Sequence, residues 1–285
     1  MVYLKRDKMD NINFIEFDKY LLQQTSCKII HQIWFGIIPS RLEAKKDFKK
    51  LEKYRTSWVI KNPTWKYVCW NFKRCRELMK TFFPEHLHMY DSYPHHIQRC
   101  DCVRYFILFR YGGLYADVDF MCVRPWDEVL TQYPNDLYIV ETPNKMDVDS
   151  VHISNSLMYV GVKKHKYWKH VFVEMEKNQK PPIYYGRHLT IMYSTGPCII
   201  NRVFRRYKNK YKLNFYPCKL FHPFGLISEI ESSNNSKIYA YHLGKGSWEE
   251  GDSKLLIFLY KYWKPMFLFL FLILFKHFVS AKFIT

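Results

Sequence analysis

Two aspartates separated by one residue are the part of this sequence whose residue types and spacing best suit chemistry. Asp117 and Asp119 lie in the run RYGGLYADVDF, residues 110–120. Two carboxylates this close repel each other and lose hydration unless a cation or bound hydrogen-bond donors compensate. Hard oxygen ligands suit Mg²⁺ or Mn²⁺, which fill their remaining positions with water and phosphate oxygens. The pair therefore indicates a divalent metal site that would neutralise a phosphorylated ligand.

The context of the pair strengthens this interpretation, because the spacing alone is also common in solvated turns, where aspartate is frequent. Alternate residues of a strand share a face, which predicts Tyr115 on the same face as the two acids and apolar residues on the core face. Those apolar residues are Leu114, Ala116 and Val118. The acids would then stand at the end of a strand in an α/β sheet, where ligands bind.

A second polar pair precedes the acids on a predicted helix. Asp101 and Arg104 are three residues apart, so they share a helix face. They form either a surface ion pair worth less than about 1 kcal/mol or a binding pair for a sugar hydroxyl and a phosphate. The helix, predicted over residues 96–113, ends at Gly112 and Gly113, and the acidic strand follows at once.

The rest of the chain alternates short apolar segments with helical ones. Strands are predicted within residues 27–36, after the turn at Asn62 and Pro63, and at 137–141, and a further apolar stretch lies at 155–162. Helices are predicted at 41–57, at 74–83 before Pro84, and at 166–177. This alternation predicts an α/β domain with a mostly parallel sheet.

The composition limits the class of partner. A net charge of +18, from 44 Lys and Arg against 26 Asp and Glu, favours an anionic partner such as nucleic acid, a membrane surface or a phosphorylated small molecule. The aromatic residues, 19% of the chain, suit an ordinary core as well as stacking on rings or sugars. The eight cysteines contain no CxxC pair, which argues against a zinc site or a disulfide framework.

The C-terminal end is the most hydrophobic part of the sequence. Residues 266–275, MFLFLFLILF, are wholly apolar, and lysines interrupt the longer segment around them. A helix that spans a bilayer needs about 20 apolar residues, so this segment is a marginal span. We divide the chain into a folded domain at 1–254 and a hydrophobic tail at 255–285. The tail is either a membrane anchor, which we favour, or a buried terminal helix.

Several sequence blocks together resemble one enzyme family. They are IIHQIWFG (29–36), RCDCVRYFILFRYGGLYADVDF (99–120), ISNSLMYV (153–160), TGP (195–197) and HLGKGSW (242–248). In this order they resemble the DXD-containing glycosyltransferases of the Och1-type mannosyltransferase group (glycosyltransferase family 32), relatives of the sugar-transfer domains of large clostridial toxins. The resemblance implies a GT-A type, Rossmann-like fold that binds a nucleotide sugar. One departure is that Arg99 and Cys100 stand where small residues commonly precede the aspartate.

The resemblance also implies roles for individual residues. Asp119 would bind Mn²⁺ or Mg²⁺ directly, Asp117 would contact the metal and the donor, and His242 would complete the metal shell. The residues implied to contact the substrates are Trp34 on the nucleotide base, Asp101 and Arg104 on the ribose or sugar, Tyr115 beside them, Asn155 on the donor sugar or acceptor, and Ser247 and Trp248 on the diphosphate. In the plainer alternatives His242 is structural and Asn155 caps a turn.

For the whole chain, the resemblance implies a metal-dependent, retaining hexosyltransferase. The donor would be GDP-mannose or, as second choice, a UDP-sugar, and the acceptor a glycan or a lipid. The enzyme would associate with a membrane through its C-terminal tail and would not bind nucleic acid. Two alternatives stay open: a basic nucleic-acid-binding module, which has no use for the acidic pair, and a non-catalytic membrane-associated scaffold with the same fold.

Overall fold

The computed structural model describes most of the chain before residue 243. The described residues are 12–23, 26–35, 51–133, 136–142, 153–222 and 237–242, with single positions 251, 252, 255, 258 and 262 beyond them. The chain forms two compact units, one of Met1–Pro181 with Ile191–Lys245 and one of Pro182–Thr190 with Gly246–Thr285. The division into 1–254 and 255–285 stays a prediction.

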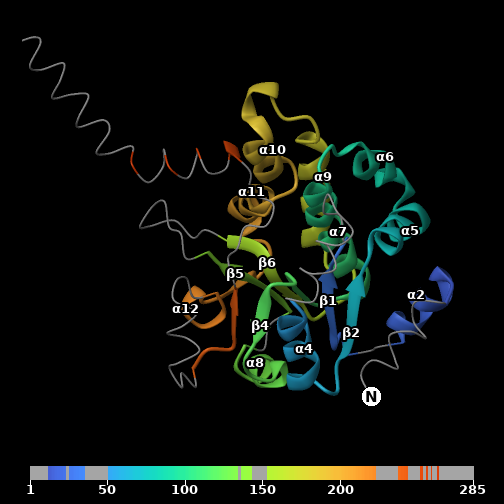
Figure 1. The fold of residues 1–285 in the computed structure, drawn as a ribbon, viewed down its shortest axis with the longest axis vertical. Helices are drawn as coiled ribbons and strands as arrows, with labels where there is room; N and C mark the ends of the chain where they lie inside the picture. Colours follow the sequence, from blue (N-terminus) through green and yellow to red (C-terminus); the bar gives the residue numbers. More distant parts are fainter. Residues whose placement is uncertain are drawn as a thin grey trace, which may run out of the picture. The chain divides into compact units, whose positions relative to one another are not determined.

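A six-stranded mixed sheet forms the centre of the first unit (Figure 1). Its order is β2 (Lys66–Trp70), β1 (Ile29–Ile33), β3 (Gly113–Ala116), β6 (Ile153–Val160), β5 (Leu137–Glu141) and β7 (Asn214–Tyr216). The pairs β2–β1, β1–β3 and β5–β7 are parallel, whereas β6 is antiparallel to both β3 and β5. Among the strands of this sheet that the structure describes, only β6 therefore runs against the others. The predicted α/β class is confirmed, with a mixed rather than uniformly parallel sheet.

Helices cover both faces of the sheet. One core cluster joins the sheet to α2 (Phe14–Leu22), α5 (Phe72–Phe82), α6 (Pro84–Ser92), α7 (His96–Tyr111), α9 (Tyr167–Lys177) and α11 (Pro197–Tyr207). The opposite cluster includes residues of α4 (Glu52–Lys61), α8 (Trp126–Gln132), α12 (Cys218–Phe221), and the small sheet of β4 (Phe120–Cys122) and β8 (Ala240–His242). Two short helical segments, η1 (Ile183–Tyr185) and α10 (Gly186–Ser194), complete the set whose bounds are defined. Both sheet faces are thus buried, which explains the long apolar runs in the strands.

The connection from α7 to β3 depends on two glycines, as the sequence predicted. Gly112 and Gly113 have φ angles of 65° and 90°, a region that side chains rarely adopt. A Cβ on Gly113 would also lie 2.4 Å from the backbone oxygen of Ile29. Because the helix stops here, β3 can pair directly with β1 and carry the chain toward the two acids.

The helix predicted at 74–83 is α5, which ends before Pro84 as predicted, and Pro84 then begins a further helix, α6, since proline is tolerated in a first helical turn. The structure corrects two other predictions around these elements. The strand ends at Ala116, two residues earlier than the alternating pattern suggested, and residues 117–119 form a turn. Val118 is consequently half-exposed rather than in the core. The helix predicted at 41–57 is α4, which runs from Glu52 to Lys61, and residues 36–50 lie outside the described part.

The predicted hydrophobic tail at 255–285 lies outside the described residues, apart from positions 255, 258 and 262. No helix in the described part of the chain combines the length and the apolar character needed to cross a bilayer. The eight cysteines are all free thiols.

Candidate metal and diphosphate site

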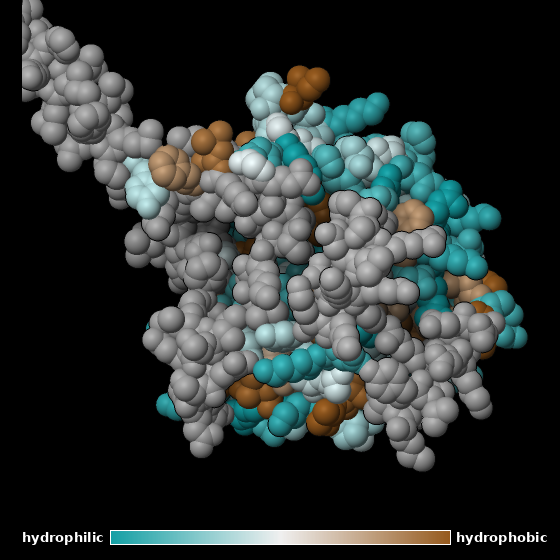
Figure 2. Space-filling view, in the orientation of Figure 1, coloured by the Kyte–Doolittle hydropathy of each residue, from teal (hydrophilic) through white to brown (hydrophobic). Residues whose placement is uncertain are grey.

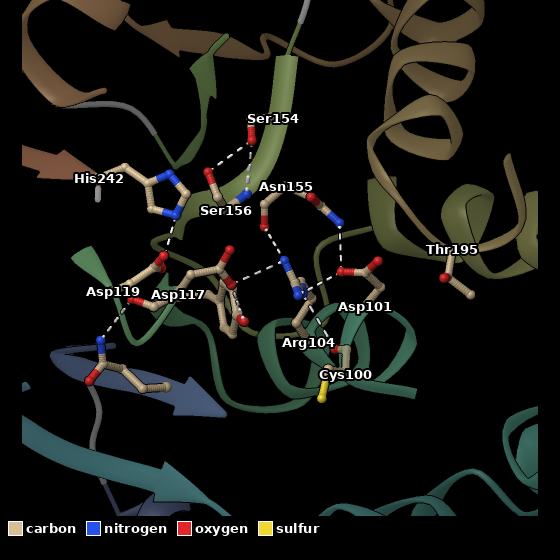
Figure 3. A network of polar contacts seen from close by, with 12 residues as sticks. Cys100, Asp101, Arg104, Asp117, Asp119, Ser154, Asn155, Ser156, Thr195 and His242 are labelled. Carbon is tan, nitrogen blue, oxygen red and sulfur yellow. Dashed lines mark hydrogen bonds and ion pairs between the residues drawn. The ribbon is translucent and has the colours of Figure 1, made fainter. Parts of the chain in front are cut away.

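The turn between β3 and β4 presents the two acids, and its backbone is held on both sides. The N–H of Asp117 donates to the oxygen of Ser156 on β6 at 2.9 Å, and the Asp117 oxygen accepts from the Phe120 N–H at 3.0 Å. The same oxygen accepts from the Gln32 side chain at 3.0 Å. Strands on either side of β3 therefore hold the position at which Asp117 and Asp119 leave the sheet (Figure 3).

The small sheet brings a histidine from a distant part of the sequence to this turn. Phe120 of β4 is paired with His242 of β8, and the His242 Nε2 lies 2.9 Å from Asp119 Oδ1. One ligand atom each from Asp117, Asp119 and His242 lie within 4.8 Å of one another. Their side chains are 28%, 21% and 19% exposed, so solvent and ligands reach them. The three predicted metal ligands are thus brought together.

Arg104 connects the acidic turn to α7. Its guanidinium lies 2.6 Å from Asp101 Oδ1 and 3.3 Å from Asp117 Oδ1, and donates to the backbone oxygen of Asn155 at 2.8 Å. The guanidinium also stacks over the Tyr115 ring, 4.6 Å from its centroid. Asp101 and Arg104 are buried, so the surface ion pair considered from the sequence is wrong and the pair belongs to an internal network.

Asn155, which Figure 3 shows beside Asp101 and Arg104, and Tyr115 complete this network. The Asn155 amide donates to Asp101 Oδ1 at 3.1 Å and to the Tyr105 hydroxyl at 3.0 Å. Asn155 lies inside β6, so it does not cap a turn. The Tyr115 hydroxyl donates to Asp117 Oδ1 at 2.7 Å. One oxygen of Asp117 is therefore held by both Tyr115 and Arg104, which fixes the rotamer of the carboxylate.

Burial makes these carboxylic acids harder to ionise. It raises the pKa of Asp101 to about 6, against the opposing effect of Arg104. The pKa of Asp117 is also raised, mainly by burial, with the negative charge of Asp119 adding to it and Arg104 opposing it. A further positive charge beside Asp117 and Asp119 would favour both carboxylates in their ionised form.

His242 is shifted in the direction expected for a histidine beside a carboxylate. Burial by itself would lower its pKa, but the hydrogen bond and charge of Asp119 outweigh burial and leave the pKa raised. Carboxylate oxygens and an imidazole nitrogen are a donor set that suits Mn²⁺ and accepts Mg²⁺. The residues present therefore fit the divalent cation that the sequence indicated.

Of the three remaining predicted site residues, Trp34 lies in the described part of the chain and the other two lie outside it. Trp34 follows β1 and donates its backbone N–H to the Trp70 oxygen at 2.8 Å. Because β1 and β3 are parallel neighbours, Trp34 lies at the same sheet edge as Asp117. Ser247 and Trp248 lie outside the described residues.

Sequence reasoning missed two residues that support the site. Gln32, which donates to the Asp117 oxygen, accepts from the Tyr67 hydroxyl at 2.6 Å. A polar residue inside the apolar strand IIHQI was a signal for it. The other is His222, whose ring packs 5.0 Å from the ring of His242, and no sequence signal distinguished it.

Comparison with known proteins places this site in a family. Residues 49–136 match the family described as "Glycosyltransferase sugar-binding region containing DXD motif". The chain is 30% identical over 250 residues to inositol phosphoceramide mannosyltransferase 2 of Schizosaccharomyces pombe, covering 88% of this chain and 64% of that protein. It is 28% identical to mannosyl phosphorylinositol ceramide synthase CSH1 of Saccharomyces cerevisiae, covering 72% of this chain and 50% of that one.

Among solved structures, the PaToxG glycosyltransferase is similar with a TM-score of 0.43 and 15% identity, over 73% of this chain and 79% of that one. The matched family region of the chain contains α7 with Asp101 and Arg104, and the turn with Asp117 and Asp119. The chain spans just under two thirds of the first fungal relative and half of the second. It belongs to the DXD-containing glycosyltransferases of the Och1-type mannosyltransferase group.

Proposed function

We propose that this protein is a metal-dependent, retaining mannosyltransferase that uses a nucleoside-diphosphate sugar, GDP-mannose in the first place. The observation that carries the proposal is the convergence of Asp117, Asp119 and His242 beside the buried Arg104. These side chains come from elements far apart in sequence and meet at the edge where parallel strands end. The sheet with a single reversed strand supports a GT-A type fold for the domain.

Asp119, His242 and Asp117 would hold Mn²⁺ or Mg²⁺. When bound, the ion supplies Lewis-acid stabilisation of the charge that develops on the departing diphosphate. The side chain of Asp119 is available for this role once His242 no longer donates to it. The side chain of Asp117 is oriented in advance, because Tyr115 and Arg104 both hold its Oδ1 atom.

Arg104 would orient the donor rather than act as an acid. Burial lowers its pKa, but the charges around it, with that of Asp101 the largest, together outweigh burial and leave the pKa raised, so the guanidinium keeps its proton. A fixed cation next to the leaving diphosphate stabilises negative charge without reorganisation. Asp101, Asn155 and Tyr115 would contact the ribose or sugar. Trp34 would stack on the base, and Ser247 and Trp248 would reach the diphosphate.

The transfer would be retaining, with the diphosphate itself taking the acceptor's proton. The bond between the anomeric carbon and the diphosphate oxygen breaks, and a bond from the acceptor hydroxyl oxygen to the anomeric carbon forms on the same face. The hydroxyl proton goes to the diphosphate oxygen. In this scheme the chain needs no separate general base, and its carboxylates Asp101 and Asp117 remain engaged with Arg104.

The proposed acceptor is a lipid with a phosphoinositol headgroup. The names of both fungal relatives join mannose to an inositol-containing ceramide. The second unit also exposes large hydrophobic residues. Ile183 and Tyr184 are 99% and 82% exposed, and hydrophobic colour is visible near α10 (Figure 2). Leu255, Phe258 and Tyr262 are exposed in the same unit. Tyrosine and aliphatic side chains suit the bilayer interface, so we propose that this unit contacts the membrane that holds the acceptor.

A donor screen tests the proposed function. The purified chain is incubated with GDP-mannose and with UDP-sugars, with and without Mn²⁺, and with inositol phosphoceramide in vesicles as the acceptor. We expect mannosylated lipid from GDP-mannose only when Mn²⁺ or Mg²⁺ is present. Transfer that is equally fast in excess chelator would contradict metal dependence. Binding to RNA or DNA that falls steeply with salt, without any sugar transfer, would instead favour a nucleic-acid-binding module.

A further inference from the structure

Three aromatic rings pack together beside the acidic turn. Phe120 of β4, His222 at the end of α12 and His242 of β8 have ring centroids 4.6 to 5.4 Å apart, with interplanar angles of 25° to 31°. His242 is the proposed metal ligand, and Phe120 directly follows the Asp119 turn. His222 is therefore in contact with the metal site although it is not among its three converging groups.

His222 is a polar residue without a polar partner. It is 8% exposed, and neither of its ring nitrogens has a hydrogen-bond partner among the residues that the structure describes. A buried polar atom that loses water without gaining a partner destabilises the folded chain. A phenylalanine would fill the same space and keep the ring stack without this cost. The residue type therefore lowers the stability of the ligand-free chain, which is the pattern of a group retained for binding.

The imidazole ring of His222 can donate a hydrogen bond from a ring N–H. It therefore offers the kind of donor that an anionic oxygen beside His242 would accept.

We propose that His222 is a diphosphate-binding residue, whose ring N–H donates to an oxygen of the nucleoside diphosphate when the metal site is loaded. The inference rests on the proposed function and adds a contact to it. The partner oxygen would arrive with the nucleoside diphosphate, beside the proposed metal ligand His242, whose ring lies against His222. The hydrogen bond formed in the complex would offset the destabilisation that the unpaired nitrogens of His222 cause in the ligand-free chain.

His222→Phe tests this with two measurements that should move in opposite directions. Thermal unfolding of the ligand-free variant should occur at a higher temperature than that of the wild type, because two unpaired buried nitrogens are removed. Affinity for GDP or UDP in the presence of Mn²⁺, measured by calorimetry, should fall by about 10-fold, as expected for a lost hydrogen bond to a charged group. A purely structural role for His222 would not produce this opposition.

Two further variants keep the test decisive. His222→Gln retains an N–H donor and should recover part of the affinity. His170→Phe is a matched control, since His170 stacks on Tyr207 with ring centroids 3.8 Å apart on a different part of the domain. It should leave diphosphate affinity unchanged. If His222→Phe does not fold, the affinity of His222→Ala relative to that of His222→Gln gives the same comparison.

The outcomes separate this inference from the proposed function. Wild-type protein that binds no nucleoside diphosphate with Mn²⁺ would contradict the proposed function. Wild-type binding with unchanged affinity in His222→Phe would overturn the role of His222 alone. A loss of Mn²⁺ affinity that is equally large without nucleotide would also overturn it, because the partner would then be a metal-bound water rather than the diphosphate.

Discussion

At the scale of the residue, the proposed function depends on a few side chains that are held by more than one partner. Arg104 contacts Asp101 at 2.6 Å, Asp117 at 3.3 Å and the Asn155 oxygen at 2.8 Å. The contacts are made by both terminal nitrogens of the planar guanidinium, Nη2 to Asp101 and Nη1 to Asp117 and Asn155, which a lysine ammonium cannot reproduce. We therefore expect the role of Arg104 to depend on the geometry of its guanidinium as well as on its positive charge.

Replacing Arg104 by lysine should reduce sugar transfer by about 100-fold, because the charge remains while the three fixed contacts are lost. The measurement is kcat with the donor that the wild type uses. Arg76→Lys is a matched control, since Arg76 makes a two-point contact with Asp91 on the surface. Equal kcat values for Arg104→Lys and the wild type would contradict the role assigned to the guanidinium.

At the scale of the element, polar contacts join the end of α7 both to β1 and to α2. The pattern of apolar residues in the sequence does not reveal these contacts. His31 of β1 accepts from the Trp70 indole at 3.2 Å, and its other nitrogen lies 3.0 Å from the Gly112 oxygen. Indole is only a donor, so the His31 Nδ1 is unprotonated and its Nε2–H donates to Gly112. Asp18 of α2 accepts from Arg110 at 2.6 Å and from the Tyr111 hydroxyl at 2.7 Å.

The protonation of His31 should make the fold sensitive to acid. Burial lowers the pKa of His31 to about 3, from 6.5 in the unfolded chain. The unfolded state then binds the extra proton below pH 6.5, so this contribution to stability is complete above pH 6.5 and is lost as the pH falls toward 3. The loss between pH 6.5 and 5 should be about 2 kcal/mol.

Urea unfolding of wild type and His31→Phe across this pH range measures the effect. The variant should be less stable at pH 7, because Gly112 and Trp70 lose their partner, but should lose less stability on acidification. Parallel curves for the two proteins would show that His31 does not titrate as proposed.

The Asp18 contact should hold α2 on the domain. Asp18→Ala leaves Arg110 and Tyr111 without their carboxylate partner, which should lower the free energy of unfolding by about 3 kcal/mol. Asp91→Ala removes an exposed partner of Arg76 and should cost less than about 1 kcal/mol. Denaturant unfolding of both variants checks the difference, and similar losses for the two would argue against a special role for Asp18.

Several elements could be predicted from the sequence, and the reasons are physical. The helix that ends at Gly112 was predictable because two glycines permit the positive φ angles of a helix stop. The turn at residues 117–119 was not, because hydrophobic alternation continues through Val118 although the ladder with β6 ends at Ala116. The pairing of Phe120 with His242 depends on tertiary packing across more than a hundred residues. The family resemblance implied a metal-binding role for His242, whereas neither the residue pattern nor the resemblance pointed to His222.

At the scale of the whole molecule, we propose a nucleotide-sugar site in one unit and, separately, a membrane contact for the other. A net charge of +18 suits both an anionic donor and an anionic lipid surface, so it does not discriminate between them. The chain matches 64% of the length of the first fungal relative, and the lipid acceptor is therefore a proposal about this chain. Whichever acceptor is used, we expect sugar transfer to require a divalent ion held at Asp119.

Mn²⁺-dependent sugar transfer by the wild type, Asp119→Asn and Asp127→Asn tests this claim most directly. Asp127 pairs with Lys28 at 2.9 Å and is a matched carboxylate outside the site. Asp119→Asn should reduce transfer by about 1,000-fold with an unchanged unfolding temperature, because a neutral amide is a poor ligand for the cation. Asp127→Asn should transfer at the wild-type rate. Undiminished transfer by a folded Asp119→Asn variant would show that transfer does not require an ion held at Asp119.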